Sequence, residues 1–168
     1  MKLSTLVAAV FGLLLTTQAN SATETFSAAG GLEVSDTRSI PVLIADLPSN
    51  ETKRGLSKDV IEARVNAVLR NNGLKPVEAT EATDHNYRVQ VLVAGTTVFI
   101  QAAFSRAVTY NNGIAERHTR ADTWSRLYLN DWNLLDKGHS GAAVDSILDQ
   151  VSRLTEQFAN EFLKANGK

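Results

Sequence analysis

Residues 87–108 read YRVQVLVAGTTVFIQAAFSRAV, and this stretch decides the fold class. Apolar side chains recur at every second position on both sides of residues 94–96, where Gly95 permits a tight turn. Alternation with a period of two is typical of strands that bury one face. The stretch therefore predicts two antiparallel strands, with Tyr87 and Val89 facing the core.

Further strands are expected on both sides of this pair. An Asn-Gly turn signal at residues 112–113 precedes a third long strand over Thr119–Leu129, which completes an antiparallel meander. Two shorter strands are expected over Ser39–Leu47 and Leu74–Ala79. Pro41 cannot donate a ladder hydrogen bond, so we expect it at a strand start or on an edge.

Two segments have the periodicity of helices. Ser57 can cap a helix over Lys58–Asn72, because apolar residues then recur on one stripe and Gly73 provides a left-handed stop. A longer helix is expected from Ser140, as its cap, to about Ala165. The order is therefore strand, helix, four strands, helix (β-α-β-β-β-β-α).

This order predicts an α+β fold. We expect a two-layer sandwich, in which a mostly antiparallel sheet of four to five strands carries both helices on one face. Each helix has a single apolar stripe, and one shared sheet face buries both stripes. The opposite face of the sheet would then be open, or covered by a partner.

The N-terminal residues predict export from the cytoplasm. Residues 1–22 have the order of a secretory signal peptide: Lys2, an apolar run, then small residues up to Ala22. Residues 23–38, rich in Ala, Gly, Ser and Thr, are expected as a flexible leader. A single domain follows over residues 39–168. The absence of cysteine removes an acylation site, so we expect a soluble periplasmic or secreted protein.

Composition and motifs argue against several functions. The formal net charge is −1, without the basic excess that nucleic-acid partners favour. His85, His118 and His139 stand far apart in predicted loops, so we expect surface histidines and neither a metal nor another cofactor. We identify no catalytic residue, since no nucleophile has a recognisable motif context.

The third long strand carries the candidate partner-binding residues. These occupy its even positions: Arg120, Trp124, Arg126 and Tyr128. If the odd positions pack under the helices, the even side displays aromatic rings beside guanidinium groups, as interface hot spots do. The alternative is that Trp124 and Tyr128 pack in the core while the arginines reach out to solvent.

Several stretches resemble small bacterial envelope proteins. They are SIPVLIADLP (39–48), Gly-Leu-Ser at 55–57, the strand over Tyr87–Val93, and Ala-Asp-Thr-Trp at 121–124. The element order is also similar to the small α/β domain at the N-terminus of the Tol–Pal translocation protein and in the curli-secretion lipoprotein. The resemblance implies a non-catalytic role in envelope assembly or binding.

The sequence therefore favours a soluble periplasmic binding or assembly domain. Such a domain would engage an envelope protein through an exposed sheet face or edge. One alternative is a small periplasmic hydrolase that uses His85 or His118 with nearby carboxylates. Another is a protein that binds carbohydrate or a small ligand in a cleft between helices and sheet.

Overall fold

The structure is a computed structural model that describes residues 31–47, 55–111, 116–131 and 141–168. It confirms the α+β class and the predicted order of elements. The elements are β1 (Ser39–Ile44), α2 (Lys58–Asn71), β2 (Lys75–Glu78), β3 (His85–Ala94), β4 (Thr97–Asn111), β5 (Glu116–Asp131) and α4 (Ala142–Ala165).

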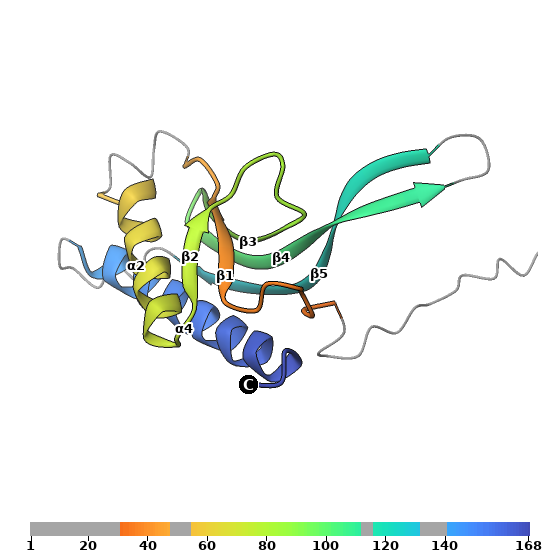
Figure 1. Ribbon diagram of the computed structural model, residues 1–168. Helices are drawn as coiled ribbons and strands as arrows, with labels where there is room; N and C mark the ends of the chain where they lie inside the picture. The colour runs from red at the N-terminus through yellow and green to blue at the C-terminus, as the bar shows by residue number, and fades with distance from the viewer. Residues whose placement is uncertain (1–30, 48–54, 112–115, 132–140) are drawn as a thin grey trace, which may run out of the picture.

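The strands form one mixed sheet in the order β2-β1-β3-β4-β5. β1 is parallel to both of its neighbours, and β3, β4 and β5 form the predicted antiparallel meander. The helices α2 and α4 lie against each other and cover the same face of the sheet (Figure 1). Within the described residues, no helix has the length and apolar character required to span a membrane.

Pro41 lies inside the sheet, in β1, and not in an edge strand. It is aligned with Val77 of β2, whereas pairing of β1 with β3 begins one residue later, at Val42. At Pro41 the strand therefore has a neighbour on one side only, so the missing N–H leaves no ladder bond unmade.

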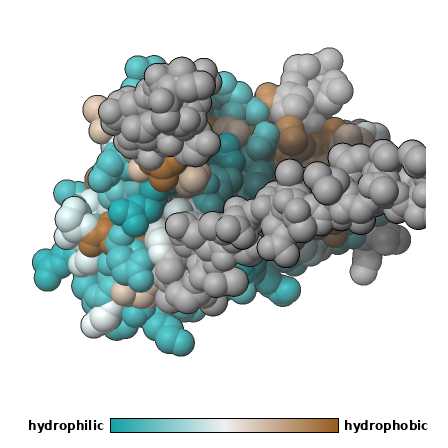
Figure 2. Space-filling view, turned by 90° about the vertical axis from the view of Figure 1, so that its right-hand side faces the viewer, coloured by the Kyte–Doolittle hydropathy of each residue, from teal (hydrophilic) through white to brown (hydrophobic). Residues whose placement is uncertain are grey.

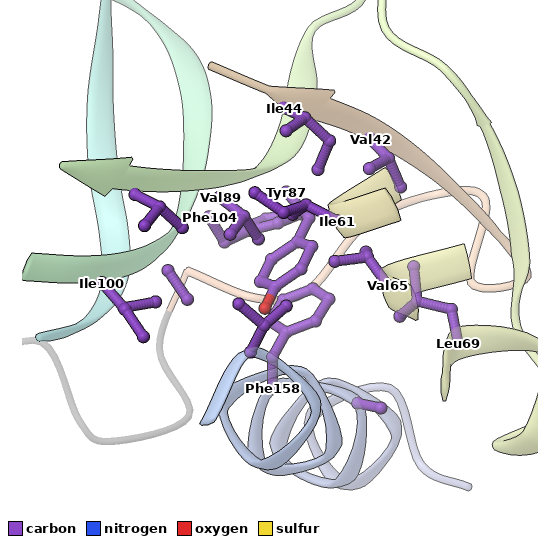
Figure 3. Packing of buried hydrophobic residues seen from close by; sticks show 14 of the residues in the cluster. Val42, Ile44, Ile61, Val65, Leu69, Tyr87, Val89, Ile100, Phe104 and Phe158 are labelled. Carbon is purple, nitrogen blue, oxygen red and sulfur yellow. The ribbon is translucent and has the colours of Figure 1, made fainter. Parts of the chain in front are cut away.

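The core fills the space between the sheet and the helices. Tyr87, Val89, Ile100 and Phe104 point from the sheet toward the helices, and the ring of Tyr87 stacks on Phe158 of α4 at 4.2 Å between centroids (Figure 3). The Tyr87 hydroxyl lies 3.1 Å from the hydroxyl oxygen of Thr155, and burial raises the pKa of the tyrosine above its usual value. The aromatic rings thus fix the distance between sheet and α4.

The two helices begin in different ways. Ser57 caps α2 as predicted, with its Oγ accepting from the N–H of Val60 at 3.2 Å. The N-cap of α4 is Gly141, which has a φ of 98° and provides no side-chain hydrogen bond. The expected cap, Ser140, lies outside the described residues. Thus the predicted cap is found for α2, while α4 begins at Ala142.

β4 and β5 continue past the rest of the sheet as a two-stranded ribbon (Figure 1). Pairing of β3 with β4 ends at His85–Arg106, beyond which β4 pairs with β5 alone. A β-bulge lies at Phe104/Ser105, where Thr123 of β5 has no aligned residue in β4. Such a bulge reverses the side-chain alternation on one strand.

Residues 31–38, expected as part of a flexible leader, pack against the domain. Leu32 is 1% exposed and belongs to the hydrophobic core. The Asn166 side chain accepts from the Val34 N–H at 3.1 Å and donates to the Leu32 carbonyl oxygen at 3.1 Å. The packed domain therefore begins before residue 39, because the end of α4 supplies partners for this N-terminal segment.

Candidate interaction surface

The predicted exposed row on β5 is not found as expected. Trp124 is 5% exposed and faces α4, whereas Leu127 and Leu129 on the opposite side are 62% and 54% exposed. The cause is the register with β4, which sets Trp124 beside Phe104 and Tyr128 beside Ile100. Residues opposite each other on paired strands point to the same face of the sheet. Phe104 points to the face that the helices cover, so Trp124 also points into the core.

Trp124, Arg126 and Glu161 form a compact cluster between β5 and α4. The indole Nε1 of Trp124 donates to Glu161 Oε2 at 2.7 Å. Arg126 Nη2 donates to Glu161 Oε1 at 3.1 Å, and its guanidinium lies 5.2 Å from the centre of the Trp124 ring. These three groups satisfy one another, so the structure favours the alternative in which the tryptophan packs and the arginine reaches outward.

The other two predicted residues lie apart from this cluster. Arg120 is exposed and donates to the carbonyl oxygen of Thr83, in the loop before β3. Tyr128 is half-buried against the core, and its hydroxyl accepts from Asn130 Nδ2 at 2.6 Å. Partner binding by Arg120, Trp124, Arg126 and Tyr128 stays a prediction, although they do not form one exposed row.

The face of the sheet away from the helices carries side chains in cross-strand rows, which follow from the pairing of β3, β4 and β5. One row contains Leu92, Phe99 and Leu129, and the next contains Gln90, Gln101 and Leu127. Leu43 of β1, 40% exposed, lies beside Arg88 on the same face. We call this surface the open face.

One end of the open face is apolar. Leu92, Leu127 and Leu129 are exposed there, and a shallow hollow of about 120 Å³ is lined by Gln90, Leu92, Phe99, Gln101 and Leu127. Figure 2 shows hydrophobic surface gathered toward one side of an otherwise mostly hydrophilic view. Because contiguous exposed apolar patches mark interaction sites, this end is the strongest candidate among the described residues.

The other end of the open face is polar. Asp122 accepts from Ser105 Oγ at 2.5 Å and from Arg88 Nη2 at 3.3 Å. The bulge at Thr123 places Asp122 on this face, because it aligns Asp122 with Ser105. The carboxylate is therefore paired on both oxygens, and this end is polar surface with its charges matched.

His85 differs from the surface histidine expected from the sequence. It lies in β3, is 8% exposed, and its Nδ1 is 2.6 Å from Asp84 Oδ1. Its Nε2 is buried and has no hydrogen-bond partner among the described residues. The ring packs beside Phe104 at 5.5 Å between centroids, so the nitrogen that a substrate would need faces the protein. His118 also lies in a strand, β5, although its side chain and residue 139 are outside what the structure describes.

A second hollow lies beside the start of α2. It has a volume of about 420 Å³ and is lined by Asp46, Leu47, Ser57, Lys58 and Asp59. Lys58 is already paired with Asp46 at 3.0 Å. Among the described residues, no three His, Asp or Glu side chains gather as metal ligands. The hollow therefore presents two carboxylates and a neutralised cation.

Comparisons with known proteins add little to this geometry. No family model matches the chain, and no curated protein matches it. Among solved structures, the chain is similar to a minor lipoprotein from Acinetobacter baumannii, with a TM-score of 0.23 and 12% identity. That match covers 77% of this chain and 93% of the other. The resemblance to the Tol–Pal and curli-secretion domains stays a prediction.

Proposed function

We propose that this protein is a periplasmic binding or assembly domain that engages an envelope protein partner through its open face. The observation that carries the proposal is the apolar end of that face. There Leu92, Phe99 and Leu129 form one cross-strand row beside the exposed Leu127. The helices α2 and α4 lie on the opposite face, so they leave this row uncovered.

The shape of the apolar end supports a protein partner over a small molecule. Its hollow of about 120 Å³ is well below the roughly 300–1,000 Å³ of ligand pockets. The amides of Gln90 and Gln101 flank the leucines on one side, as polar groups flank the apolar centre of protein interfaces. Export is supported by the signal-peptide pattern of residues 1–22.

The hydrolase alternative has one supporting distance, the 2.6 Å between Asp84 and His85. A general base must reach the proton that it abstracts. The Nε2 of His85 is buried and the ring packs against Phe104, so this nitrogen does not reach a substrate at the surface. The interaction role is therefore the better supported function.

A position-specific cross-linking experiment tests the proposal. A photoreactive amino acid replaces Leu92 on the open face or, as a matched control, the exposed Glu62 on α2. In cells that export the protein, we expect a discrete adduct with another envelope protein from position 92 and none from position 62. Leu127→Asp should reduce the yield of the adduct at least tenfold, because it sets a charge inside the apolar end.

Two results would contradict the proposal. One is equal cross-linking from positions 92 and 62. The other is an adduct that contains only further copies of this chain, identified by mass spectrometry.

A further inference from the structure

Among the residues that the structure describes, no strand pairs with the outer edge of β5. The hairpin between β3 and β4 has a two-residue turn at Gly95 and Thr96, so its closing pair, Ala94–Thr97, is hydrogen-bonded. From this pair onward, hydrogen-bonded and non-hydrogen-bonded pairs alternate along the strands. The odd residues of β4 therefore direct their N–H and C=O groups toward β3, and its even residues direct theirs toward β5. The aligned even residues of β5 thus bond inward, and Ser125, Leu127 and Leu129 direct their N–H and C=O groups outward.

Two side-chain contacts agree with this pattern. Arg126 Nη1 donates to the outward carbonyl oxygen of Ser125 at 3.1 Å. The outward N–H of Asp131 donates to Asn130 Oδ1 at 2.8 Å. Between these satisfied positions, the N–H and C=O groups of Leu127 and Leu129 point away from β4, and none of the described residues bonds to them. They are also the most exposed of the large apolar residues that the structure describes.

Within the described part of the chain, this stretch of the edge lacks the usual protection. Natural edge strands are commonly guarded by Pro, Lys, inward charges or a covering segment. Upstream, Gly31 lies against β5 and its carbonyl oxygen accepts from Thr123 Oγ1 at 2.8 Å. Downstream, residues 125–130 contain no Pro or Lys, and the charge of Arg126 is neutralised by Glu161. The free edge therefore fits one more extended strand.

The strand that matches this edge best is β5 of a second copy of the chain. In an antiparallel pair with a two-fold axis at Tyr128, Leu127 of each copy lies opposite Leu129 of the other. Arg126 of one copy then lies opposite Asn130 of the other, so no like charges meet. Moving the axis to Leu127 would set Leu129 opposite Ser125 and lose one apolar match. The sequence of the edge is thus self-complementary in this register.

We propose that two copies of this chain pair through β5, antiparallel about Tyr128, and join their sheets into one of ten strands. The pairing satisfies the outward groups of Leu127 and Leu129 and brings their side chains together. It also makes the two open faces continuous. This inference does not depend on the proposed envelope partner, because it concerns purified protein alone.

Sedimentation equilibrium on the purified protein tests the pairing. A standard protein interface buries about 1,600 Å² of surface, and a short strand pair buries less. We therefore expect a reversible dimer with a dissociation constant of about 10 μM. Leu127→Lys with Leu129→Lys should weaken it at least tenfold. Leu129→Pro should do the same, since it removes an outward N–H and leaves the ladder to β4 intact. Circular dichroism checks that each variant folds.

The matched control is Leu43→Lys with Leu92→Lys, which removes exposed leucines from the same face but away from the edge. These variants should leave the dissociation constant unchanged. If the protein stays monomeric at a concentration about 50 times the expected dissociation constant, the proposal is overturned. A dimer that the control variants abolish and the edge variants do not also overturns it, because that result indicates contact through the faces.

Cysteine cross-linking reports the register. The chain has no cysteine, so a single introduced thiol gives an unambiguous signal. Tyr128→Cys should form a disulfide-linked dimer under mild oxidation, because residue 128 faces its own copy across the axis. Ser125→Cys should not, as its copy lies several residues away along the strand. Linking through Ser125→Cys and not through Tyr128→Cys would overturn the proposed axis.

Discussion

Gly31 shows how a single residue joins the N-terminal segment to the sheet. Its φ is +92°, and a Cβ built on it would lie 2.6 Å from Thr123 Cβ. Any other residue therefore meets both an unfavourable backbone conformation and a steric clash. The close approach also sets the Gly31 carbonyl oxygen within reach of the Thr123 hydroxyl, at the bulge of β5.

Gly31→Ala should therefore destabilise the protein more than a glycine substitution without the clash. The matched control is Gly55→Ala, since Gly55 has a φ of +88° and nothing within 4 Å of the added Cβ. We expect a cost of about 1 kcal/mol for Gly55→Ala and about 2–4 kcal/mol for Gly31→Ala. Urea denaturation measures both, and equal costs would show that the segment moves aside freely.

At the level of elements, β5 contributes different chemistry on its two sides. Toward α4 it presents Trp124 and Arg126, both bonded to Glu161. On the open face it presents Leu127 and Leu129, which have no covering element among the described residues. Glu161 thus links the edge strand to α4, while no described strand pairs with the outer edge of β5.

Glu161→Ala should loosen this link between strand and helix. It leaves the buried Trp124 N–H without an acceptor and removes the partner of Arg126, at a cost of about 1–3 kcal/mol. Glu156→Ala is the control, because Glu156 is exposed on the same helix, and it should change stability by less than about 0.5 kcal/mol. Thermal and urea denaturation compare the two variants, and similar losses would contradict the role given to Glu161.

At the level of the whole molecule, hydrogen bonds join the two ends of the described chain. Asn166, just after α4, bonds to the backbone of Leu32 and Val34. Lys168 Nζ donates to the carbonyl oxygen of Thr37 at 3.0 Å. These bonds close the domain along one side, where the N-terminal segment runs between α4 and β5.

Asn166→Ala should release the N-terminal segment without unfolding the sheet. The Val34 amide loses its acceptor, so its hydrogen exchange should accelerate at least tenfold, while core amides such as that of Val89 keep their rates. Lys164→Ala, on the exposed side of the same helix end, should leave both rates unchanged. Uniform acceleration across the sheet would show that Asn166 supports the whole fold instead.

Local patterns predicted the elements well. Ser57 and Gly73 marked the ends of α2, and the alternation around Gly95 marked β3 and β4. The same patterns left the orientation of β5 undecided, because apolar residues occupy both its even and odd positions. A period of two looks the same from either face, so only pairing with a neighbour selects the buried side.

The sequence by itself therefore determined the elements, their order and the single apolar stripe of each helix, because these depend on neighbours within a few residues. Tertiary structure alone decided that Trp124 faces α4, that Leu127 and Leu129 stay exposed, and that Leu32 belongs to the core. Each of these depends on contacts between residues distant in the chain. The register of β5 against β4, together with the bulge at Thr123, sets which side chains β5 presents at the open face and its edge.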